Sequence, residues 1–468
     1  MAAAERHIVI VGGGITGLAA AHRLAELRRE RNLPLEVTLL EGSDHLGGII
    51  RTERAADCIL ERGPDSFITD KPWALDLCER LGIEEQHIGT GKAHRRAFVV
   101  HKRRLYPVPQ GFQLLAPSRL WPLLTTSLFS LRGKLRMAVE PFLPARPPAE
   151  DESLADFVTR RLGREALERM AAPMVAGIYG ADPARLSLAA TLPRFLEMER
   201  EHGSVVRGLW ARQRLRGEGR AVSGARYGLF VSFAAGMQTL SDALAASLPE
   251  GWARLGVSVV GLAQTEAGWR VTLSTGETLT AEAVCLALPA YAAGALLAEV
   301  DADLAAQLNA IPYAAAATLN LLYDEADLPR PLEGFGFVAP ASEGLTLLGC
   351  TFAHIKYPGR APPGKALLRV FLGEAALQGR EDAELIAAVR ADLRELTGIA
   401  AEPELTLMSR LPRAMAQYEV GHLRRVAEIE AEAAQHPDLA LAGNAYHGIG
   451  IPDCIRSGEQ AALAMVEG

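Results

Sequence analysis

Cysteine is scarce in this chain and follows no pattern. The 468 residues include five cysteines, at positions 58, 78, 285, 350 and 454, and no two of them form a Cys-x-x-Cys pair. No histidine cluster has the spacing of metal ligands. The sequence therefore predicts neither a disulfide framework nor a metal site, and a reducing compartment is expected.

Long apolar runs are missing as well. No uninterrupted run reaches the length of a transmembrane helix, and a strand expected from His7 leaves no room for a cleavable signal peptide. We expect a cytoplasmic protein, soluble or peripheral on the inner face of the cell membrane. The net charge of −7 gives no reason to expect a nucleic-acid partner.

The composition excludes a disordered chain. Hydrophobic residues make up 49% of the sequence and charged residues 22%, as in folded globular proteins. A chain of 468 residues is too long for one simple core, so two or three domains are expected.

Acidic residues are absent from one long window, Gln86 to Val139. Its basic residues are Lys92, Arg95, Arg96, Lys102, Arg103, Arg104, Arg119, Arg132, Lys134 and Arg136. Apolar residues and aromatic anchors beside these cations are typical of a segment that lies on anionic lipid. The alternative is a domain surface whose apolar face packs on the core, and some cations could also meet an acidic substrate. The sequence leaves these interpretations open.

The first fifty residues form an expected strand-turn-helix-strand unit. An apolar strand from His7 to Val11 runs into a Gly-x-Gly-x-x-Gly turn, an Ala-rich helix follows, and a second strand from Leu35 ends at Glu41. The glycines allow a tight turn and a close approach to a pyrophosphate, and Glu41 is placed to accept hydrogen bonds from a ribose. The residues predicted to hold a dinucleotide are Gly12, Gly13, Gly14, Ile15, Thr16, Gly17 and Glu41.

A second glycine turn follows this unit. Gly42 leads to the pair Gly47-Gly48 and then to Arg51, an order similar to that of flavoproteins of the glutathione-reductase type. The resemblance implies that these four residues line an FAD pocket. It also implies that the next turn lies against the isoalloxazine, with the residues Gly63, Pro64, Asp65 and Ser66.

Later strands are expected to complete the cofactor domain and add a second sheet. A strand from Val257 to Leu262 is the expected return to the cofactor domain, where the resemblance puts the Val259 backbone on the adenine. The strands expected to form a substrate sheet span residues 311–324, 335–338, 345–352 and 367–373. A helix is expected from Glu381 to Leu396.

The end of the chain carries a third glycine turn. A strand from Leu439 reaches Asn444, and Gly448-Ile449-Gly450-Ile451 precedes a helix expected from Gly458 to Val466. Such a turn places the positive end of a helix beside a bound group. In flavoproteins of this kind that group is the flavin pyrimidine.

The whole chain resembles the oxygen-dependent protoporphyrinogen and coproporphyrinogen oxidases, which are FAD enzymes of haem synthesis in the monoamine-oxidase-like superfamily. The motifs that carry the resemblance are Gly12 to Gly17, Leu46-Gly-Gly48, Glu61-Arg-Gly-Pro64, Gly177-Ile-Tyr-Gly180, Gly334-Phe-Gly-Phe337, Gln417-Tyr418-x-x-Gly421-His422 and Gly448 to Ile455. Some relatives carry arginine where this chain has Asp65.

The resemblance implies a mixed α/β and α+β fold in three parts. The first is a split, Rossmann-like FAD-binding domain made of residues 1–90, 225–300 and 420–468. The second is a mixed-sheet substrate domain made of residues 91–110 and 301–419. The third is an α-helical, membrane-associating domain made of residues 111–224.

The implied activity is the oxidation of protoporphyrinogen IX to protoporphyrin IX by non-covalent FAD and dioxygen. Six electrons leave in three steps, each passing a hydride to the flavin, and peroxide is released. The chemistry is centred on the flavin, so no catalytic side chain is predicted. The residues expected to touch the substrate are Arg96, or alternatively Arg95, on a propionate, the Gly177 carbonyl on the pyrrole N–H groups, and Phe337 and Tyr357 as walls of the pocket. Tyr418 is expected to contact the cofactor.

Several alternatives stay open at this stage. Coproporphyrinogen III differs from protoporphyrinogen only at the rim of the ring and is the alternative substrate. Another flavin amine oxidase or desaturase, a flavin-dependent mutase and a non-catalytic FAD-binding protein are further alternatives. Expected partners are the porphyrinogen and dioxygen, with an anionic membrane surface, the next haem-pathway enzyme and a second copy of the chain as further candidates.

Overall fold

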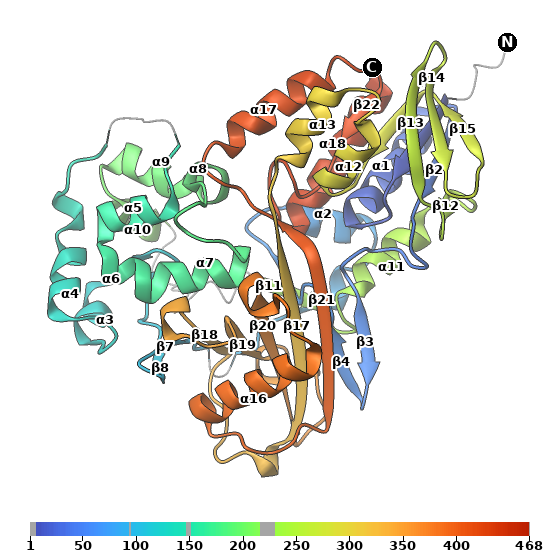
Figure 1. Ribbon diagram of the computed structural model, residues 1–468. Coiled ribbons are helices and arrows are strands. Elements are labelled where there is room, and N and C mark those ends of the chain that lie inside the picture. The colour runs from blue at the N-terminus through green and yellow to red at the C-terminus, as the bar shows by residue number, and fades with distance from the viewer. Residues whose placement is uncertain (1–5, 93–94, 147–150, 216–229, 468) are drawn as a thin grey trace.

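The computed structural model describes residues 6–92, 95–146, 151–215 and 230–467. The molecule has three parts, which Figure 1 shows as an upper sheet with its helices, a lower sheet and a group of helices to one side. In the described part of the chain, no helix is both long enough and apolar enough to cross a membrane.

A five-stranded parallel sheet with the order β12-β2-β1-β16-β22 forms the upper part. Its strands are β1 (Arg6–Val11), β2 (Leu35–Leu40), β12 (Ala253–Arg254), β16 (Ala283–Leu286) and β22 (Leu439–Leu441). Ile8, Ile10 and Cys285 are fully buried under the helices. The N-terminal strand β1 and the C-terminal strand β22 both pair with β16, so the predicted cofactor unit is assembled from distant segments.

Two long helices cover this sheet, α1 (Ile15–Arg31) and α18 (Ile451–Glu467). Gly458 of α18 has no room for a side chain, because a Cβ atom there would lie 2.2 Å from the Thr16 carbonyl oxygen. The helix expected from Gly458 begins seven residues earlier, at Ile451, so that expectation is wrong at its start. The predicted glycine turn therefore leads directly into the helix.

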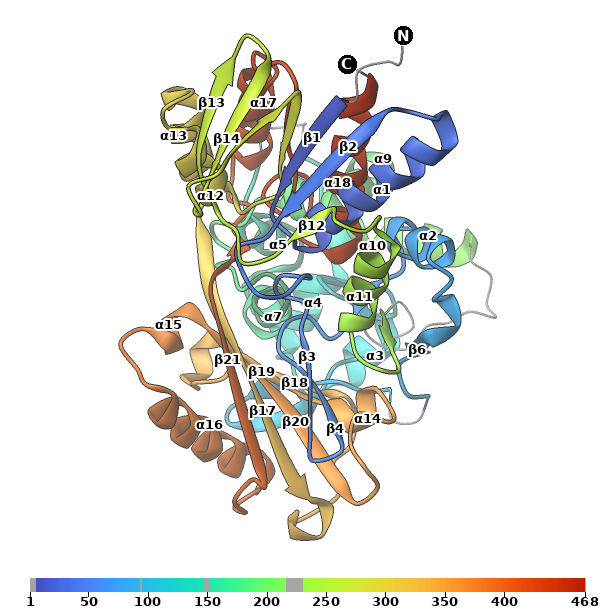
Figure 2. The same cartoon turned by 90° about the vertical axis from the view of Figure 1, so that its right-hand side faces the viewer.

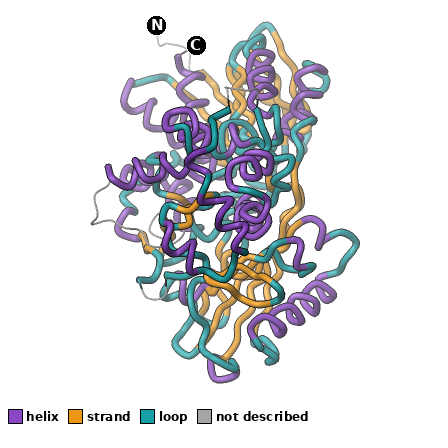
Figure 3. Tube along the Cα trace, turned by 90° about the vertical axis from the view of Figure 1, so that its left-hand side faces the viewer, coloured by secondary structure: helices purple, strands orange, loops and turns teal. Residues whose placement is uncertain are grey.

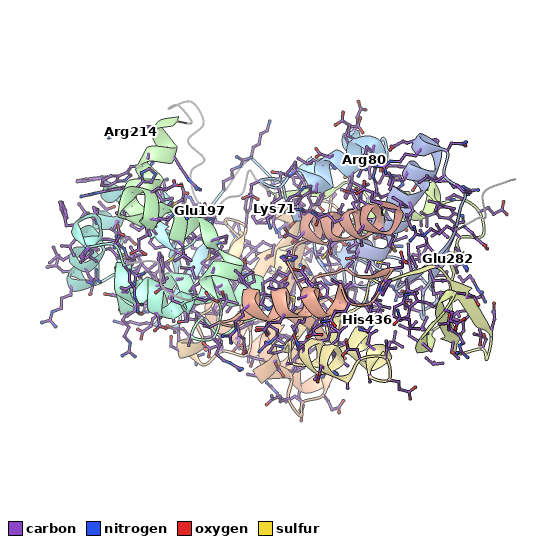
Figure 4. The ribbon with its side chains drawn as sticks, turned by 90° about the horizontal axis from the view of Figure 1, so that it is seen from above. Lys71, Arg80, Glu197, Arg214, Glu282 and His436 are labelled. Carbon is purple, nitrogen blue, oxygen red and sulfur yellow. The ribbon has the colours of Figure 1, made fainter. Side chains whose placement is uncertain are left out.

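Smaller elements complete this part and connect it to the rest. They are β3 (Thr52–Ala55), β4 (Cys58–Glu61), β5 (Phe67–Ile68), α2 (Trp73–Arg80), β6 (His87–Gly89), β11 (Phe230–Phe233), α11 (Gln238–Ser247), β13 (Val259–Thr265), β14 (Gly268–Leu273), β15 (Thr278–Ala281), α12 (Ala290–Leu297), α13 (Ala302–Asn309) and α17 (His422–Ala433). Figure 4 shows Lys71 and Arg80 beside α18. Both pair with it, Lys71 with Asp453 at 2.5 Å and Arg80 with Glu459.

The lower part is a seven-stranded mixed sheet with the order β21-β17-β20-β19-β18-β7-β8. Its strands are β7 (Phe98–His101), β8 (Arg104–Pro107), β17 (Tyr313–Asp324), β18 (Gly336–Val338), β19 (Gly349–Phe352), β20 (Lys365–Gly373) and β21 (Leu405–Ala416). The helix α16 (Asp382–Thr397) packs Leu385, Val389 and Leu393 on one face. The predicted strands are confirmed, and β21 is an addition.

The third part consists of helices around their own apolar core, and Figure 3 faces it. Its helices are α3 (Leu120–Thr125), α4 (Leu131–Ala138), α5 (Leu154–Leu162), α6 (Arg164–Ala166), α7 (Ala172–Tyr179), α8 (Leu188–Thr191), α9 (Pro193–His202) and α10 (Val205–Leu215). The two-stranded sheet β9 (Phe112–Gln113) and β10 (Ala116–Pro117) precedes them. The side of α7 that bears Gly177 lies against β18 of the lower sheet.

Candidate active site

The glycine turn after β1 has the geometry that a pyrophosphate requires. Gly12 has φ +107°, a conformation that favours glycine, and a Cβ atom on Gly17 would lie 1.9 Å from the Gly12 carbonyl oxygen. A Cβ atom on Gly14 would meet nothing within 4 Å, so this position faces open space. No side chain caps α1 at Gly14. The backbone N–H groups that begin α1, at Ile15, Thr16 and Gly17, therefore lack a side-chain acceptor and can meet an anion.

Glu41 lies beside this turn at the end of β2. One carboxylate oxygen accepts a hydrogen bond from Gly13 N at 2.7 Å and the other from Ser43 N at 2.8 Å. The Glu41 carbonyl accepts from Val257 N at 2.9 Å, which places the segment leading to Val259 next to it. A Cβ atom on Gly42 would lie 2.5 Å from Ser258 Oγ. The residues predicted for the ribose and adenine end are therefore brought together.

The second glycine pair stacks directly on the first turn. Gly47 N donates to the Gly13 carbonyl at 2.8 Å, and Gly48 has φ +60° with its Cβ position 3.3 Å from Gly14 Cα. A Cβ atom on Gly63 would lie 1.8 Å from the Ile49 carbonyl oxygen. The segments Gly12–Gly17, Gly47–Gly48 and Gly63 thus form one compact layer, the glycine layer. Arg51 closes it, since its carbonyl accepts from Arg62 N.

Tyr418 holds the C-terminal turn in place. Its hydroxyl donates to the Asn444 carbonyl and accepts from Gly448 N, both at 2.8 Å, and its ring stacks on His422 with centroids 3.8 Å apart. Burial raises the pKa of the Tyr418 hydroxyl far above its ordinary value. It therefore stays protonated and can keep donating. Ile449 and Gly450 follow, and α18 begins at Ile451, with Cys454 N donating to the Gly450 carbonyl.

Two predicted substrate residues stand on facing elements. Gly177 lies in the last turns of α7 with an exposed backbone, and its Cβ position is 3.7 Å from Val338 Cγ1 of β18. Carbonyls in a last helical turn lack partners inside the helix. Phe337, the neighbour of Val338, points the other way, because it is buried in the core under α16 and its ring contacts Phe352 edge-on. Val338, and not Phe337, faces α7.

The other predicted substrate residues are more scattered. Arg96 is exposed at 68% of its side chain and lies 3.9 Å from Glu333, while Arg95 bonds the Gly91 carbonyl. Both arginines are on the surface next to the β7–β8 hairpin. Tyr357 is buried, with the Lys356 ammonium 4.9 Å from its ring centroid. The contacts of Arg95, Arg96 and Tyr357 do not bring these residues together with Gly177 in one site.

Sequence reasoning missed a buried group of charges on the turn that carries Asp65. The Asp65 carboxylate lies 2.9 Å from Lys356 Nζ and 3.7 Å from an Arg369 nitrogen. Burial by itself would raise the pKa of Asp65, but Lys356 and Arg369 outweigh it and hold this pKa well below its ordinary value. Asp65 Oδ1 also accepts from Ser66 at 2.7 Å. The signal was in the sequence, since Arg369 is the one charge in the apolar run Leu367–Leu372.

These observations fit a bound dinucleotide. The first glycine turn leaves open space at Gly14, no side chain caps the helix behind it, and a carboxylate stands where a ribose would lie. Among the described residues no group of three or more metal-ligating side chains occurs.

Comparison with known proteins agrees with this geometry. The family model described as flavin containing amine oxidoreductase matches residues 15–466. Relatives named coproporphyrinogen III oxidase are 36% identical in Bacillus subtilis, covering 98% of both chains, and 35% identical in Propionibacterium freudenreichii, covering 99% of this chain and 92% of that one. A relative named chloroplastic protoporphyrinogen oxidase 1, from Spinacia oleracea, is 30% identical over 98% of this chain and 84% of its own.

Solved structures show the same fold. A structure from Exiguobacterium sp. 255-15, titled as a candidate protoporphyrinogen oxidase, has a TM-score of 0.87 at 30% identity and covers 99% of this chain and 100% of its own. Reduced UDP-galactopyranose mutase has a TM-score of 0.73 at 15% identity, covers 99% of this chain and 96% of its own, and shows the fold alone. The chain belongs to the flavin-containing amine oxidoreductase family, and its cofactor is FAD.

Proposed function

We propose that this chain is an oxygen-dependent porphyrinogen oxidase of haem biosynthesis. The observation that carries the proposal is full-length similarity to relatives named porphyrinogen oxidases, at 36% identity over 98% of both chains for the first of them. The cofactor layer described above supports an FAD-dependent oxidoreductase, and the bound flavin would supply hydride acceptance from the substrate. The FAD is held without a covalent bond.

Each predicted cofactor residue has a proposed part. The first glycine turn, Gly12 to Gly17, holds the pyrophosphate, Glu41 and Gly42 the ribose, and the Val259 backbone the adenine. The residues proposed around the flavin are Gly47, Gly48, Arg51, Gly63, Pro64, Asp65, Ser66, Asn444, Ile449, Gly450 and Ile451, with Tyr418 fixing the last segment. Support comes from their contiguity, since Gly47 bonds Gly13 and Tyr418 bonds the 444–448 turn.

The substrate is proposed to lie beside the last turn of α7, where the exposed Gly177 stands next to Val338 of the lower sheet. The last turn of α7 would present the Gly177 carbonyl to pyrrole N–H groups, which are donors in need of an acceptor. Arg95 and Arg96, exposed at the surface, would meet ionised propionates as charge-assisted partners. Phe337 supports this face from behind, and Tyr357 supports the Asp65 turn.

Coproporphyrinogen III is the favoured substrate within this proposal. The sequence alone leaned slightly towards protoporphyrinogen IX, but the relatives at 35–36% identity are named coproporphyrinogen III oxidases, and the chloroplastic relatives named protoporphyrinogen oxidase are 28–30% identical. Coproporphyrinogen carries more carboxylates, which suits the proposed contacts with Arg95 and Arg96.

The helical part is proposed to touch an anionic membrane surface. Leu123, Leu128 and Met137 pack inside, so part of the apolar sequence does serve the core. Other apolar side chains of the same segment stay exposed, namely Trp121, Leu124, Leu131, Leu135, Val139 and Phe142. Arg132 is exposed between them, which suits an interfacial surface on the inner face of the cell membrane.

The division into an FAD-binding, a substrate-binding and a helical domain, with the boundaries given above, is part of the proposal. It is supported by strand pairing, since β7 of residues 91–110 joins the lower sheet through β18. The next enzyme of the pathway and a second copy of the chain are partners proposed from the resemblance alone.

One experiment tests the function directly. The purified protein should have a yellow flavin spectrum and should convert coproporphyrinogen III to a fluorescent porphyrin with release of peroxide. Protoporphyrinogen IX is offered in parallel, and the larger kcat/KM identifies the substrate. A protein that binds FAD but oxidises neither compound would contradict the proposal.

A further inference from the structure

A buried cluster of charged side chains contacts the turn that carries Asp65. Its members are Glu61, Asp65, Lys356, Arg360 and Arg369, whose side chains are at most 16% exposed. Lys356 is the last residue of α14 (Ala353–Lys356), and Arg369 lies in the middle of β20. The cluster therefore joins the lower sheet to the segment just after β4.

The lower sheet holds this segment through its backbone as well. Asn320 donates to the Glu61 carbonyl at 3.1 Å, Thr318 donates to the Arg62 carbonyl at 3.2 Å, and Arg369 donates to the Gly63 carbonyl. Thr318, Asn320 and Arg369 share one face of the sheet, because β17 and β20 pair Asn320 with Arg369. Figure 2 shows β3 and β4 in front of this sheet. The turn is thus fixed against a polar patch in an otherwise apolar sheet.

The charges of the cluster do not balance. Three cations, Lys356, Arg360 and Arg369, face two carboxylates, Glu61 and Asp65, so one positive charge is left over. Burial opposes the charge on Lys356, but the Asp65 carboxylate outweighs it and raises the Lys356 pKa. Burial raises the pKa of Glu61 despite Arg360, and a neutral Glu61 would only enlarge the excess.

Two donors of the cluster also lack acceptors. Within the described part of the chain, Arg360 Nη1 and Arg369 Nε are buried without a hydrogen-bond partner. Arg360 Nη2 donates to Ser232 Oγ at 2.6 Å, and the Ser232 hydroxyl donates to the Asp65 carbonyl. An unmatched buried cation is costly, and strongly perturbed charged groups are concentrated at functional sites.

We infer that this cluster, which includes the buried cation Lys356, stabilises the negative charge that the flavin gains on reduction. The inference rests on the proposed function, which places the Gly63–Ser66 turn against the flavin. Each substrate step gives the flavin a hydride, which is two electrons and one proton, while a pyrrole N–H loses a second proton. Dioxygen then takes up the two electrons and two protons and leaves as hydrogen peroxide. The cluster changes no bond in these steps and acts only as fixed positive charge.

The midpoint potential of the bound flavin tests the inference without any porphyrinogen. Lys356→Met should shift the equilibrium at a fixed potential at least tenfold towards the oxidised flavin, which for a two-electron couple lowers the midpoint by about 30 mV. Asp65→Asn should move the potential in the opposite direction, because it removes a carboxylate. Lys356→Arg, which keeps the charge, should restore most of the value.

Lys365→Met is the matched control. Lys365 is a partly exposed lysine that pairs with Asp324 and Glu404 on the same sheet, so its loss should leave the potential unchanged. If Lys356→Met does not bind FAD, the midpoint potential of Asp65→Asn is the deciding measurement. Only a midpoint potential above that of the wild type then supports the inference.

Two results would overturn it. An unchanged potential in both Lys356→Met and Asp65→Asn means that the cluster does not act on the flavin. A raised KM for the porphyrinogen at an unchanged potential would mean that the excess charge serves a substrate carboxylate instead. If the variants show the expected potential shifts but the wild-type protein oxidises no porphyrinogen, only the proposed function is refuted.

Discussion

Gly14 and Gly17 stand three residues apart in one turn, yet a methyl group would meet different surroundings at each. On Gly17 it would collide with the Gly12 carbonyl, whereas on Gly14 it meets only open space at an ordinary backbone conformation. We expect Gly14→Ala to leave the unfolding temperature of the FAD-free protein unchanged and to weaken FAD binding at least tenfold, about 1.4 kcal/mol. FAD titration by flavin fluorescence measures the loss.

Gly89→Ala serves as the control for Gly14→Ala, because Gly89 also has open space at its Cβ position but lies in β6, away from the glycine layer. Equal FAD affinity in wild type and Gly14→Ala would show that no phosphate approaches this turn.

The Tyr418 hydroxyl is a second residue-scale test. Tyr418→Phe removes both bonds to the 444–448 turn and leaves the Gly448 N–H without its acceptor, so we expect a loss of about 1–3 kcal/mol in the free energy of unfolding. Urea unfolding of the FAD-bound protein measures it. Tyr446→Phe is the matched control, since the buried Tyr446 hydroxyl has no partner within the described residues and its removal should cost little.

At the scale of elements, the helical part depends on one buried carboxylate. Glu140 is fully buried and accepts hydrogen bonds from Arg161, Ser204 and the backbone N–H groups of Val205 and Val206 at the start of α10. Glu140→Gln leaves the buried Arg161 with one carboxylate partner, Glu199 at 3.3 Å, so we expect a cost of about 3 kcal/mol, at the lower end of the range for a broken buried ion pair.

Because Glu140 touches only this part of the molecule, hydrogen exchange should quicken in α5 and α10 while the flavin spectrum stays the same. Glu168→Gln, at the exposed partner of Arg164, is the control and should change neither. Uniform quickening across all three parts would contradict a separate helical core.

The helices and strands differ in how well the sequence predicts them. The β1 strand and α1 were predictable because an apolar run, a glycine turn and an Ala-rich stripe all agree. The strand β21 was not, because it is an edge strand with polar residues and Pro412, which an edge tolerates and a sequence pattern penalises. The basic sequence of residues 203–225 predicts only a loop with a partial helix. The structure has α10 over the first half of it, and residues 216–225 lie outside the described residues.

At the scale of the whole molecule, the sequence indicated the cofactor layer but not the charge cluster. Glycines at fixed spacing report a backbone geometry directly, so the turns at Gly12, Gly47 and Gly448 could be predicted from the chain alone. Asp65 and Arg369 are about three hundred residues apart, and only the fold shows that they meet. The direction of Phe337 likewise depends on strand register, which the sequence does not state.

The exposed apolar segment gives a prediction for the molecule as a whole. We expect the protein to sediment with vesicles that contain anionic lipid, and replacing Trp121 and Phe142 by serine should reduce the bound fraction several-fold. These two side chains are 75% and 80% exposed, so the substitutions should leave stability unchanged. Val260→Ser, at an exposed apolar residue of the upper part, is the control, and equal binding to neutral vesicles would count against the electrostatic contribution.

The most direct test of the central claim is the ratio of peroxide to porphyrin made by the purified, FAD-loaded protein from coproporphyrinogen III in air. Oxidation through a flavin in three two-electron steps predicts three molecules of peroxide for each molecule of porphyrin, with no porphyrin formed once dioxygen is removed. Porphyrin formation without peroxide, or none at all by a yellow protein from either porphyrinogen, would contradict the account.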